Sequence, residues 1–230
     1  MRNFRKRTRI IGPKYIGQSG LIASSKQDFT IQFESSLERD FIYLLEFDDD
    51  VECFIDQPLT IKYSDIKGIK RKYTPDFLVR YHDPDLKDEL IEIKYSKDLQ
   101  ENYFIWKEKF SAADEYCRQN SLLFKIVTEK EIRDSNPIYL KNVIFILGYA
   151  RNLDKVHDDS TVDKICLDSS IILDKLSQRG KSKICELLEQ LSDDEAVRAE
   201  YLYIIWILVA KKIIECDLQT ELNTKSIIWI

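Results

Sequence analysis

Three charged residues stand within or beside apolar segments of the chain, where burying a charge is costly. Asp76 follows a proline in "YTPDFLVRY", and Glu92 and Lys94 lie one residue apart in "LIEIKYS". Because side chains alternate along a strand, Glu92 and Lys94 share one face and the isoleucines beside Glu92 share the other. If Asp76, at the neighbouring bend, faces the same place, two carboxylates and one ammonium group converge.

Such a group of charges suits the hydrolysis of a phosphodiester. Carboxylate oxygens bind Mg²⁺, and a bound metal ion activates water and offsets negative charge. In this interpretation Asp76 and Glu92 bind the metal, and the backbone carbonyl of Ile93 is available as a further ligand. Lys94 would orient or deprotonate the attacking water, or stabilise the charge that builds on the phosphate. We therefore expect Mg²⁺ as the cofactor, with Mn²⁺ able to substitute.

The same residues also have an ordinary structural explanation. Glu92 and Lys94 could form the solvated face of an amphipathic strand, and Asp76 could simply follow proline in a turn. Short strings such as P-D or E-x-K are common in proteins, so neither is specific by itself. Their combination is more specific. An acid-bearing helix comes first, P-D and a second apolar strand with an acid-x-Lys pair follow, and an amphipathic helix comes last. That order is typical of the PD-(D/E)xK nuclease superfamily.

The acid-bearing helix is expected at 35–47, where apolar residues recur at helical spacing. Ser35 stands three residues before Glu38, which is the pattern of a capping box. The cap fully explains Glu38 without any catalytic role. Glu34 and Glu46 are further carboxylates on or near this helix, and the sequence offers no geometric way to choose among them.

Helical and strand patterns alternate around these residues. We expect the helix at 35–47 to begin the folded core. The elements expected after it are a strand at 59–63, a turn at 65–68, a strand ending at 77–79, a strand at 90–95, a long amphipathic helix at 99–117 and a strand at 122–129. This order predicts an α/β core.

Past about residue 130 the pattern becomes helical. The sequence predicts helices at 138–150, 170–178, 182–191 and 195–212, separated by Ser, Asp and Gly breaks. Two short β-runs around a polar turn follow, and helices followed by a hairpin suggest a winged-helix arrangement. A plain helical bundle is the alternative. The apolar run at 201–210 is interpreted either as a buried central helix, which best explains Trp206 and Leu208, or in part as a surface for a partner.

Charge is unevenly distributed along the chain. The formal net charge is −5, yet residues 1–27 hold seven Lys and Arg and no acid, so the remainder carries −12. We expect this basic arm to be flexible until it meets a polyanion or an acidic protein surface. The expected division is a basic arm at 1–27, a catalytic domain at 28–133 and a second domain at 134–230.

Composition also excludes several classes of protein. The five cysteines form no C-x-x-C pair and have no His cluster near them, so neither a disulfide framework nor a zinc site is indicated. We expect reduced, mostly buried thiols. The apolar run at 201–210 is too short to span a bilayer, and the N-terminus has no apolar signal segment. These features predict a cytoplasmic protein, associated with the nucleoid when active.

Three segments, "ESSLERDFIYLLEFDDDVECFIDQPLTIKY", "RKYTPDFLVRY" and "LIEIKYSKDL", resemble in this order the TnsA family, the endonuclease subunits of heteromeric transposases. The resemblance covers about residues 12 to 130 and, more loosely, the rest. It implies a restriction-endonuclease-like catalytic domain followed by a mainly helical, winged-helix-like domain. It also implies that the family's helix acid is Glu38, its metal-binding Asp is Asp76, and its acid-x-Lys pair is Glu92 and Lys94. Some members have Gln in place of Glu92.

The resemblance further implies cleavage of the non-transferred strand at the 5′ ends of a transposon, while a DDE transposase, TnsB, cuts the other strand. It implies that an AAA+ regulator, TnsC, binds the C-terminal domain, and that the basic arm lies on DNA or on a partner subunit. Two rival hypotheses stay open: a free-standing nuclease of restriction or repair, and a non-catalytic assembly subunit.

Overall fold

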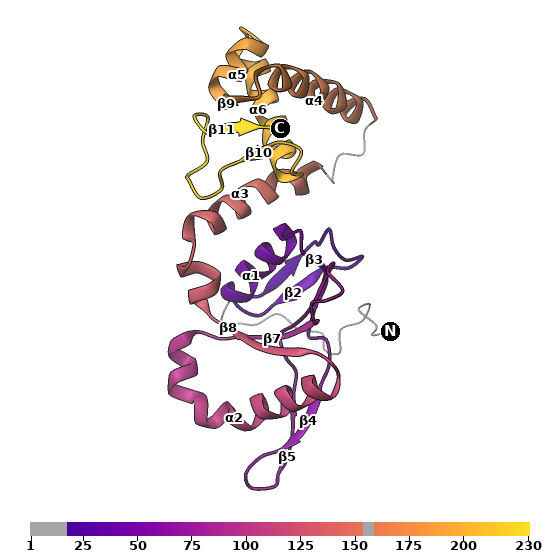
Figure 1. Cartoon of the computed structure of the whole chain (residues 1–230), viewed down its shortest axis with the longest axis vertical. Coiled ribbons are helices and arrows are strands. Elements are labelled where there is room, and N and C mark those ends of the chain that lie inside the picture. The colour runs from indigo at the N-terminus through magenta and orange to yellow at the C-terminus, as the bar shows by residue number, and fades with distance from the viewer. Residues whose placement is uncertain (1–17, 154–158) are drawn as a thin grey trace. The chain divides into compact units, whose positions relative to one another are not determined.

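The computed structural model describes residues 18–153 and 159–230. The chain divides into two compact units, the first ending at Ser135 and the second covering Asn136–Ile230 (Figure 1). Most of the basic arm expected at 1–27 lies outside the described residues. Each unit has its own helices, sheets and core.

A four-stranded sheet forms the centre of the first unit. Its strands lie in the order β3 (Val51–Asp56), β6 (Phe77–Tyr81), β7 (Glu89–Ile93) and β8 (Leu123–Val127). The first three are antiparallel, and β7 and β8 are parallel. A parallel pair needs a long crossover connection. Helix α2 (Ser96–Gln119) supplies it, as the amphipathic pattern at 99–117 predicted.

Two hydrophobic clusters lie on the two faces of this sheet. One cluster joins α1 (Ser36–Phe47) to Phe77, Val79, Ile91 and Ile93. The other joins Ala113 and Cys117 of α2 to Leu78 and Leu90. The alternation that the sequence predicted along β7 is therefore confirmed. Because Glu92 lies two residues after Leu90, its side chain is on the α2 side of the sheet.

A two-stranded ribbon precedes α1, so the expectation that the helix begins the folded core is wrong. Strand β1 (Gly20–Ile22) pairs antiparallel with β2 (Ile31–Phe33), and Ile22 and Ile31 are buried in the α1 cluster. A side chain at Gly20 would meet the Phe33 ring at 2.7 Å, so glycine lets that ring pack closely against β1. The last part of the expected flexible arm is thus a paired strand, because its apolar residues join the core.

A separate hairpin is formed by β4 (Ile61–Ser64) and β5 (Lys70–Tyr73). The predicted turn between them is confirmed, and Gly68 adopts the left-handed conformation at φ 75°. Ile61 and Tyr73 at the base of the hairpin are buried in the α2 cluster. In Figure 1 the hairpin extends past α2, and its tip lies away from the sheet.

Strand β6 starts at Phe77, whereas the sequence predicted a strand that ends at 77–79. The segment between β5 and β6 is Thr74-Pro75-Asp76, and proline has no N–H for a strand ladder. The chain therefore leaves the hairpin at Tyr73 and enters the central sheet only after Asp76. The first unit ends with η1 (Lys130–Asp134), a short π-helix in which Arg133 binds the buried Asp40 at 2.7 Å.

The second unit is mainly helical, as predicted. Its helices are α3 (Pro137–Leu153), α4 (Asp159–Arg179), α5 (Ile184–Leu191) and α6 (Glu195–Ala210). Strands β10 (Glu215–Cys216), β11 (Ile227–Trp229) and β9 (Lys181–Lys183) form a sheet in that order. The predicted C-terminal hairpin corresponds to the antiparallel pairing of β10 with β11.

Helix α6 is the central helix of this unit. All six residues of Ile204–Val209 are buried, although they extend around the whole helix. Trp206 and Leu208 are 3% and 4% exposed. The interpretation of this run as a buried core helix is therefore correct, and these residues do not form a partner surface.

The five cysteines are all free, as expected, but most are not buried. Cys117 is buried in the α2 cluster, Cys166 is exposed on α4, and the other three are partly covered. The expectation of mostly buried thiols is wrong, because Cys166 occupies an exposed position of α4 and Cys53 lies in the less covered first half of β3. Across the described ranges, no helix has the length and apolar character needed to cross a membrane.

Candidate active site

Asp76 lies across from the end of β7. The register pairs Phe77 with Ile91, so the residue before Phe77 reaches the last residues of that strand. Oδ2 of Asp76 accepts a hydrogen bond from the Ile93 amide at 2.7 Å, and its backbone carbonyl accepts one from Gln57 at 2.9 Å. Asp76 therefore meets the acid-x-Lys strand, as the sequence suggested.

Glu92 is 2% exposed and has both carboxylate oxygens engaged. Oε2 accepts the Tyr73 hydroxyl at 2.6 Å, and Oε1 accepts the ammonium groups of Lys94 at 2.9 Å and Lys109 at 2.8 Å. A buried carboxylate needs such partners, since burial without them is very costly. The solvated-face explanation of the pair is therefore wrong for Glu92.

Lys94 lies at the point where three oxygen acceptors converge. Its Nζ is 2.8 Å from the carbonyl of Ile93, 2.9 Å from Oε1 of Glu92 and 3.9 Å from Oδ2 of Asp76. These acceptors belong to two carboxylates and one backbone carbonyl. The site thus already surrounds one positive charge with oxygen atoms.

The electrostatics of the cluster reflect its burial and its charges. Burial raises the pKa of Asp76 well above its usual range, and the charges of Glu92 and Glu38 raise it further against the opposing effect of Lys94. Burial alone would lower the pKa of Lys94, but the charges of Asp76 and Glu92 outweigh it and raise that pKa. The carboxylates therefore repel each other, and additional positive charge would stabilise them.

Lys109 and Tyr73 belong to this cluster, and the sequence interpretation missed both. The Lys109 ammonium lies 4.8 Å, 5.1 Å and 4.9 Å from the ring centroids of Tyr73, Trp106 and Phe110. Three aromatic rings and one carboxylate thus surround it. A signal was available, because Lys109 is three residues after Trp106 and four before the buried Ala113, within the apolar stripe of α2.

Glu38 combines its two proposed roles. Ser35 caps α1, since its Oγ accepts the Glu38 amide at 3.1 Å, and Oε2 of Glu38 accepts the Glu34 amide at 2.7 Å. Burial raises the pKa of Glu38, and the negative charge of Glu34 contributes, while Lys94 acts in the opposite direction. Glu38 is therefore both part of the cap and within electrostatic reach of the cluster.

Two family models match the two units in turn. The model described as TnsA-like endonuclease N terminal matches residues 48–129, and the model described as TnsA endonuclease C terminal matches residues 134–218. The chain belongs to the TnsA family. No individual curated protein matches it. Its two domains are those of an endonuclease subunit of a Tn7-type transposase, so this TnsA family member is a nuclease by family.

The matched N-terminal range contains most of the cluster. Asp76, Glu92, Lys94 and Lys109 fall within residues 48–129, whereas Glu38 precedes them on α1. No group of three His, Cys, Asp or Glu side chains arranged to hold a metal ion occurs within 18–153 and 159–230. A metal in this TnsA family member would therefore depend on two carboxylates and a backbone carbonyl. The three oxygens around the Lys94 ammonium fit a hard cation, which favours oxygen ligands.

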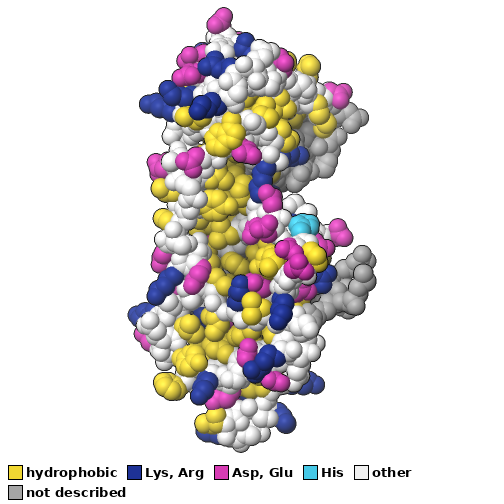
Figure 2. Space-filling model, in the orientation of Figure 1, with side chains coloured by type: hydrophobic (Ala, Val, Ile, Leu, Met, Phe, Trp, Pro, Cys, Tyr) yellow, Lys and Arg dark blue, Asp and Glu magenta, His cyan; other side chains and the backbone are white. Residues whose placement is uncertain are grey.

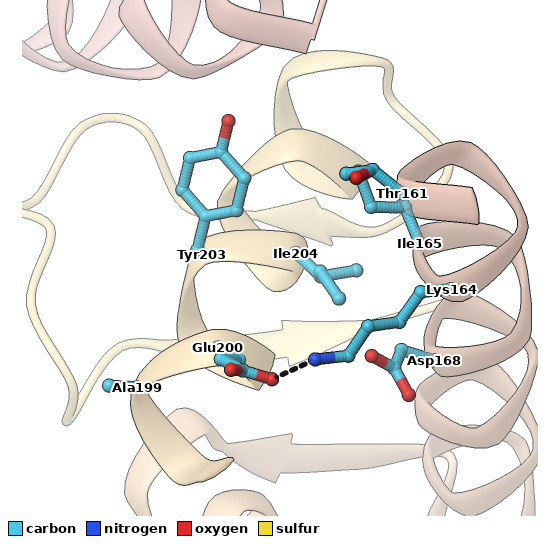
Figure 3. Close-up of a pocket in the computed structure, with 8 residues that line it drawn as sticks. All are labelled: Thr161, Lys164, Ile165, Asp168, Ala199, Glu200, Tyr203 and Ile204. Atoms are coloured by element: carbon cyan, nitrogen blue, oxygen red, sulfur yellow. Dashed lines mark hydrogen bonds and ion pairs between the residues drawn. The ribbon is translucent and has the colours of Figure 1, made fainter. Parts of the chain in front are cut away.

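A cavity of ≈ 400 Å³ lies between α4 and α6 in the second unit (Figure 3). Its lining is mostly apolar, and Lys164 of α4 binds Glu200 of α6 at 2.6 Å beside it. The cavity holds neither an acid-x-Lys pair nor a buried charge. The cluster of buried opposite charges lies in the first unit.

Proposed function

We propose that this TnsA family member is a Mg²⁺-dependent DNA endonuclease that cleaves the non-transferred strand at the 5′ ends of a transposon during cut-and-paste transposition. The observation that supports the proposal is the convergence of Asp76, Glu92 and the Ile93 carbonyl around one positive charge. The first unit is proposed to be restriction-endonuclease-like. Its central sheet, with helices on both faces and the acids at the strand ends, is consistent with that assignment.

Each residue has a proposed role. Asp76, Glu92 and the Ile93 carbonyl would hold the metal, which supplies a Lewis acid for water activation and for charge on the phosphate. Lys94, released from the carboxylates, would orient or deprotonate the attacking water, or neutralise charge that builds on the phosphate. Tyr73 and Lys109 hold the buried Glu92 in place. Glu38 adds negative charge beside Asp76.

The partners of this reaction are also proposals. We propose that TnsB cuts the transferred strand and that TnsC binds the second unit, as the resemblance implies, within the cytoplasm at the nucleoid. The second unit is proposed to be winged-helix-like, since β10 and β11 follow its helices. Exposed apolar residues of α4 offer surface for a protein partner, and they are Val162, Leu167 and Ile171.

The test is strand-specific cleavage by the full chain together with a TnsB-type transposase and a transposon-end duplex. We expect Asp76→Ala and Lys94→Ala each to abolish Mg²⁺-dependent cutting of the non-transferred strand, while the other strand is still cut. The melting temperature of Asp76→Ala should stay near the wild-type value, because the change relieves repulsion between carboxylates. Lys94→Ala should lower it modestly, because buried Glu92 then keeps only Lys109 as an ammonium partner. Chelation of the metal should have the same effect on the wild type. Wild-type cutting rates in both variants would refute the nuclease site.

A further inference from the structure

The β4–β5 hairpin has a strongly basic outer face. Residues 61–73 contain five basic residues and one acid, in a chain of net charge −5. The basic side chains are all exposed, and they are Lys62, Lys67, Lys70, Arg71 and Lys72. The acid, Asp65, binds Arg71 at 3.0 Å and also accepts the amides of Lys67 and Ile69. It holds the turn in place and leaves the lysines as the dominant charge.

Alternation along the two strands separates the faces of the hairpin. Ile61 and Tyr73 point into the α2 cluster. Their neighbours along each strand, and every second residue from there, point the other way. That outer face carries Lys62, Lys70 and Lys72. Lys62 and Lys72 are directly opposed across the strands. Like charges in this position destabilise a hairpin, so their presence calls for an anion that compensates for them.

The base of the hairpin is part of the candidate site. Tyr73, the last residue of β5, donates its hydroxyl to Glu92 at 2.6 Å, and Asp76 follows three residues later. Hydroxyl groups of Thr60 and Thr74 lie 3.1 Å apart at the same base. A polyanion bound to the hairpin would therefore lie near the acids of the site, because only three residues separate the end of β5 from Asp76. Figure 2 shows Lys and Arg side chains around the end of the first unit to which the hairpin belongs.

We propose that the outer face of the β4–β5 hairpin, with Lys62, Lys70 and Lys72, binds the phosphate backbone of duplex DNA and guides it to the active site. The inference rests on the proposed function, because it takes the substrate to be DNA. Lysines bind phosphates without reading sequence, so the surface contributes affinity and orientation and no base specificity. Sequence recognition is then left to the partner subunits.

Equilibrium binding of a fluorescent random-sequence duplex to the full chain tests the proposal, measured in EDTA so that no cleavage occurs. We expect the triple variant Lys62→Ala, Lys70→Ala, Lys72→Ala to bind on the order of 10-fold or more weakly at low salt. The slope of log affinity against log salt should fall by about 0.9 for each phosphate that the variant no longer neutralises. A control with the same net charge, Lys87→Ala, Lys97→Ala, Lys107→Ala, removes three exposed lysines elsewhere in the first unit and should bind like wild type.

A charge swap separates this role from a structural one. Lys72→Glu turns the opposed pair with Lys62 into an attractive one, so the melting temperature should rise while DNA binding weakens. A merely structural lysine would move both quantities in the same direction. Because exposed side chains are changed, the melting temperature of each variant also shows whether it is folded.

Wild-type affinity and salt slope in the hairpin triple variant would overturn the proposal. If that variant also failed to capture the TnsB-type subunit, the face would be assigned to an acidic protein partner. The binding readout stays independent of the chemistry. A wild-type protein that binds DNA through the hairpin but never cuts it would contradict the proposed function and support the hairpin.

Discussion

The interior of the first unit contains charges that the interior of the second unit lacks. In the first unit Glu92 is 2% exposed, Lys109 16% and Asp76 14%, and all three belong to one cluster. In the described part of the second unit the buried polar residues are Asn142 and Ser182, and neither is charged. Ion pairs there lie at the surface, as between Lys164 and Glu200 at 59% and 54% exposure.

The difference shows what each interior does. Removing charges from water is expensive, and a buried ion pair often adds no stability over an apolar replacement. The charge cluster around Glu92 therefore carries a cost that is consistent with a catalytic role, whereas the apolar core of the second unit is explained by stability alone. Substitutions in the two interiors should separate these roles.

The largest loss of stability is expected from the apolar interior. Trp206 is 3% exposed and its ring lies 5.2 Å from that of Phe145. Trp206→Ala should cost about 3–5 kcal/mol in the unfolding free energy of the second unit. Phe145→Ala is the control, because Phe145 is 40% exposed and should cost less. Hydrogen exchange resolved by unit gives the measurement, and equal costs for the two variants would contradict this assignment of the core.

A smaller loss is expected from the charged interior, and it should depend on metal. Lys109→Met keeps the apolar stem among the aromatic rings but leaves Lys94 as the ammonium partner of Glu92. The cost should be about 1–3 kcal/mol in EDTA. It should shrink in Mg²⁺, because a bound cation replaces part of the missing charge. Lys107→Met, at an exposed position of α2, should cause no such loss of stability and show no dependence on Mg²⁺. A loss of unfolding free energy that is the same with and without Mg²⁺ would show that Lys109 does not act together with the metal.

The two roles of Glu38 predict smaller effects, one on stability and one on cleavage. Ser35→Ala should remove the cap of α1 at a cost of about 1 kcal/mol and leave cleavage nearly unchanged. Glu38→Gln keeps an oxygen that can accept a capping bond but loses the negative charge beside Asp76. It should change the melting temperature little and reduce cleavage. The reverse pattern in paired thermal and cleavage assays would make Glu38 a cap and nothing more.

The smallest effect concerns the reactivity of a partly covered thiol in the second unit, whose burial disfavours the thiolate. Burial raises the pKa of Cys216 to about 11. The thiolate is the reactive form. Alkylation at pH 8 should therefore be slow, and its rate should climb about tenfold per pH unit until pH approaches that pKa. Mass spectrometry of the labelled protein measures this, with the exposed Cys166 as an internal reference. Equal labelling of both thiols at pH 8 would contradict it.

Local regularities made part of the site predictable. The alternation of a strand is set by covalent geometry, so the shared face of Glu92 and Lys94 could be read from two residues. The capping pattern of Ser35 and Glu38 is equally local. These predictions needed no knowledge of how segments far apart in the chain pair with each other.

Other features depend on tertiary structure and could not be predicted in this way. The meeting of Asp76 with the Ile93 amide depends on the register of β6 against β7. Lys109 was missed because a lysine on an amphipathic helix is usually solvated. The β1–β2 ribbon escaped notice because its strands are only three residues long and lie beside Gly and Ser.

Residue 93 enters the site through its backbone, since its amide binds Asp76 and its carbonyl accepts the Lys94 ammonium. Apart from proline, which has no amide hydrogen, a change of side chain at this position cannot delete either group, so aliphatic replacements there should be tolerated. The vulnerable quantity is instead the length of the connection between β6 and β7, residues 82–88, because register depends on it. We therefore expect single-residue insertions and deletions in that exposed loop to inactivate the protein, although the loop contributes no atom to the site.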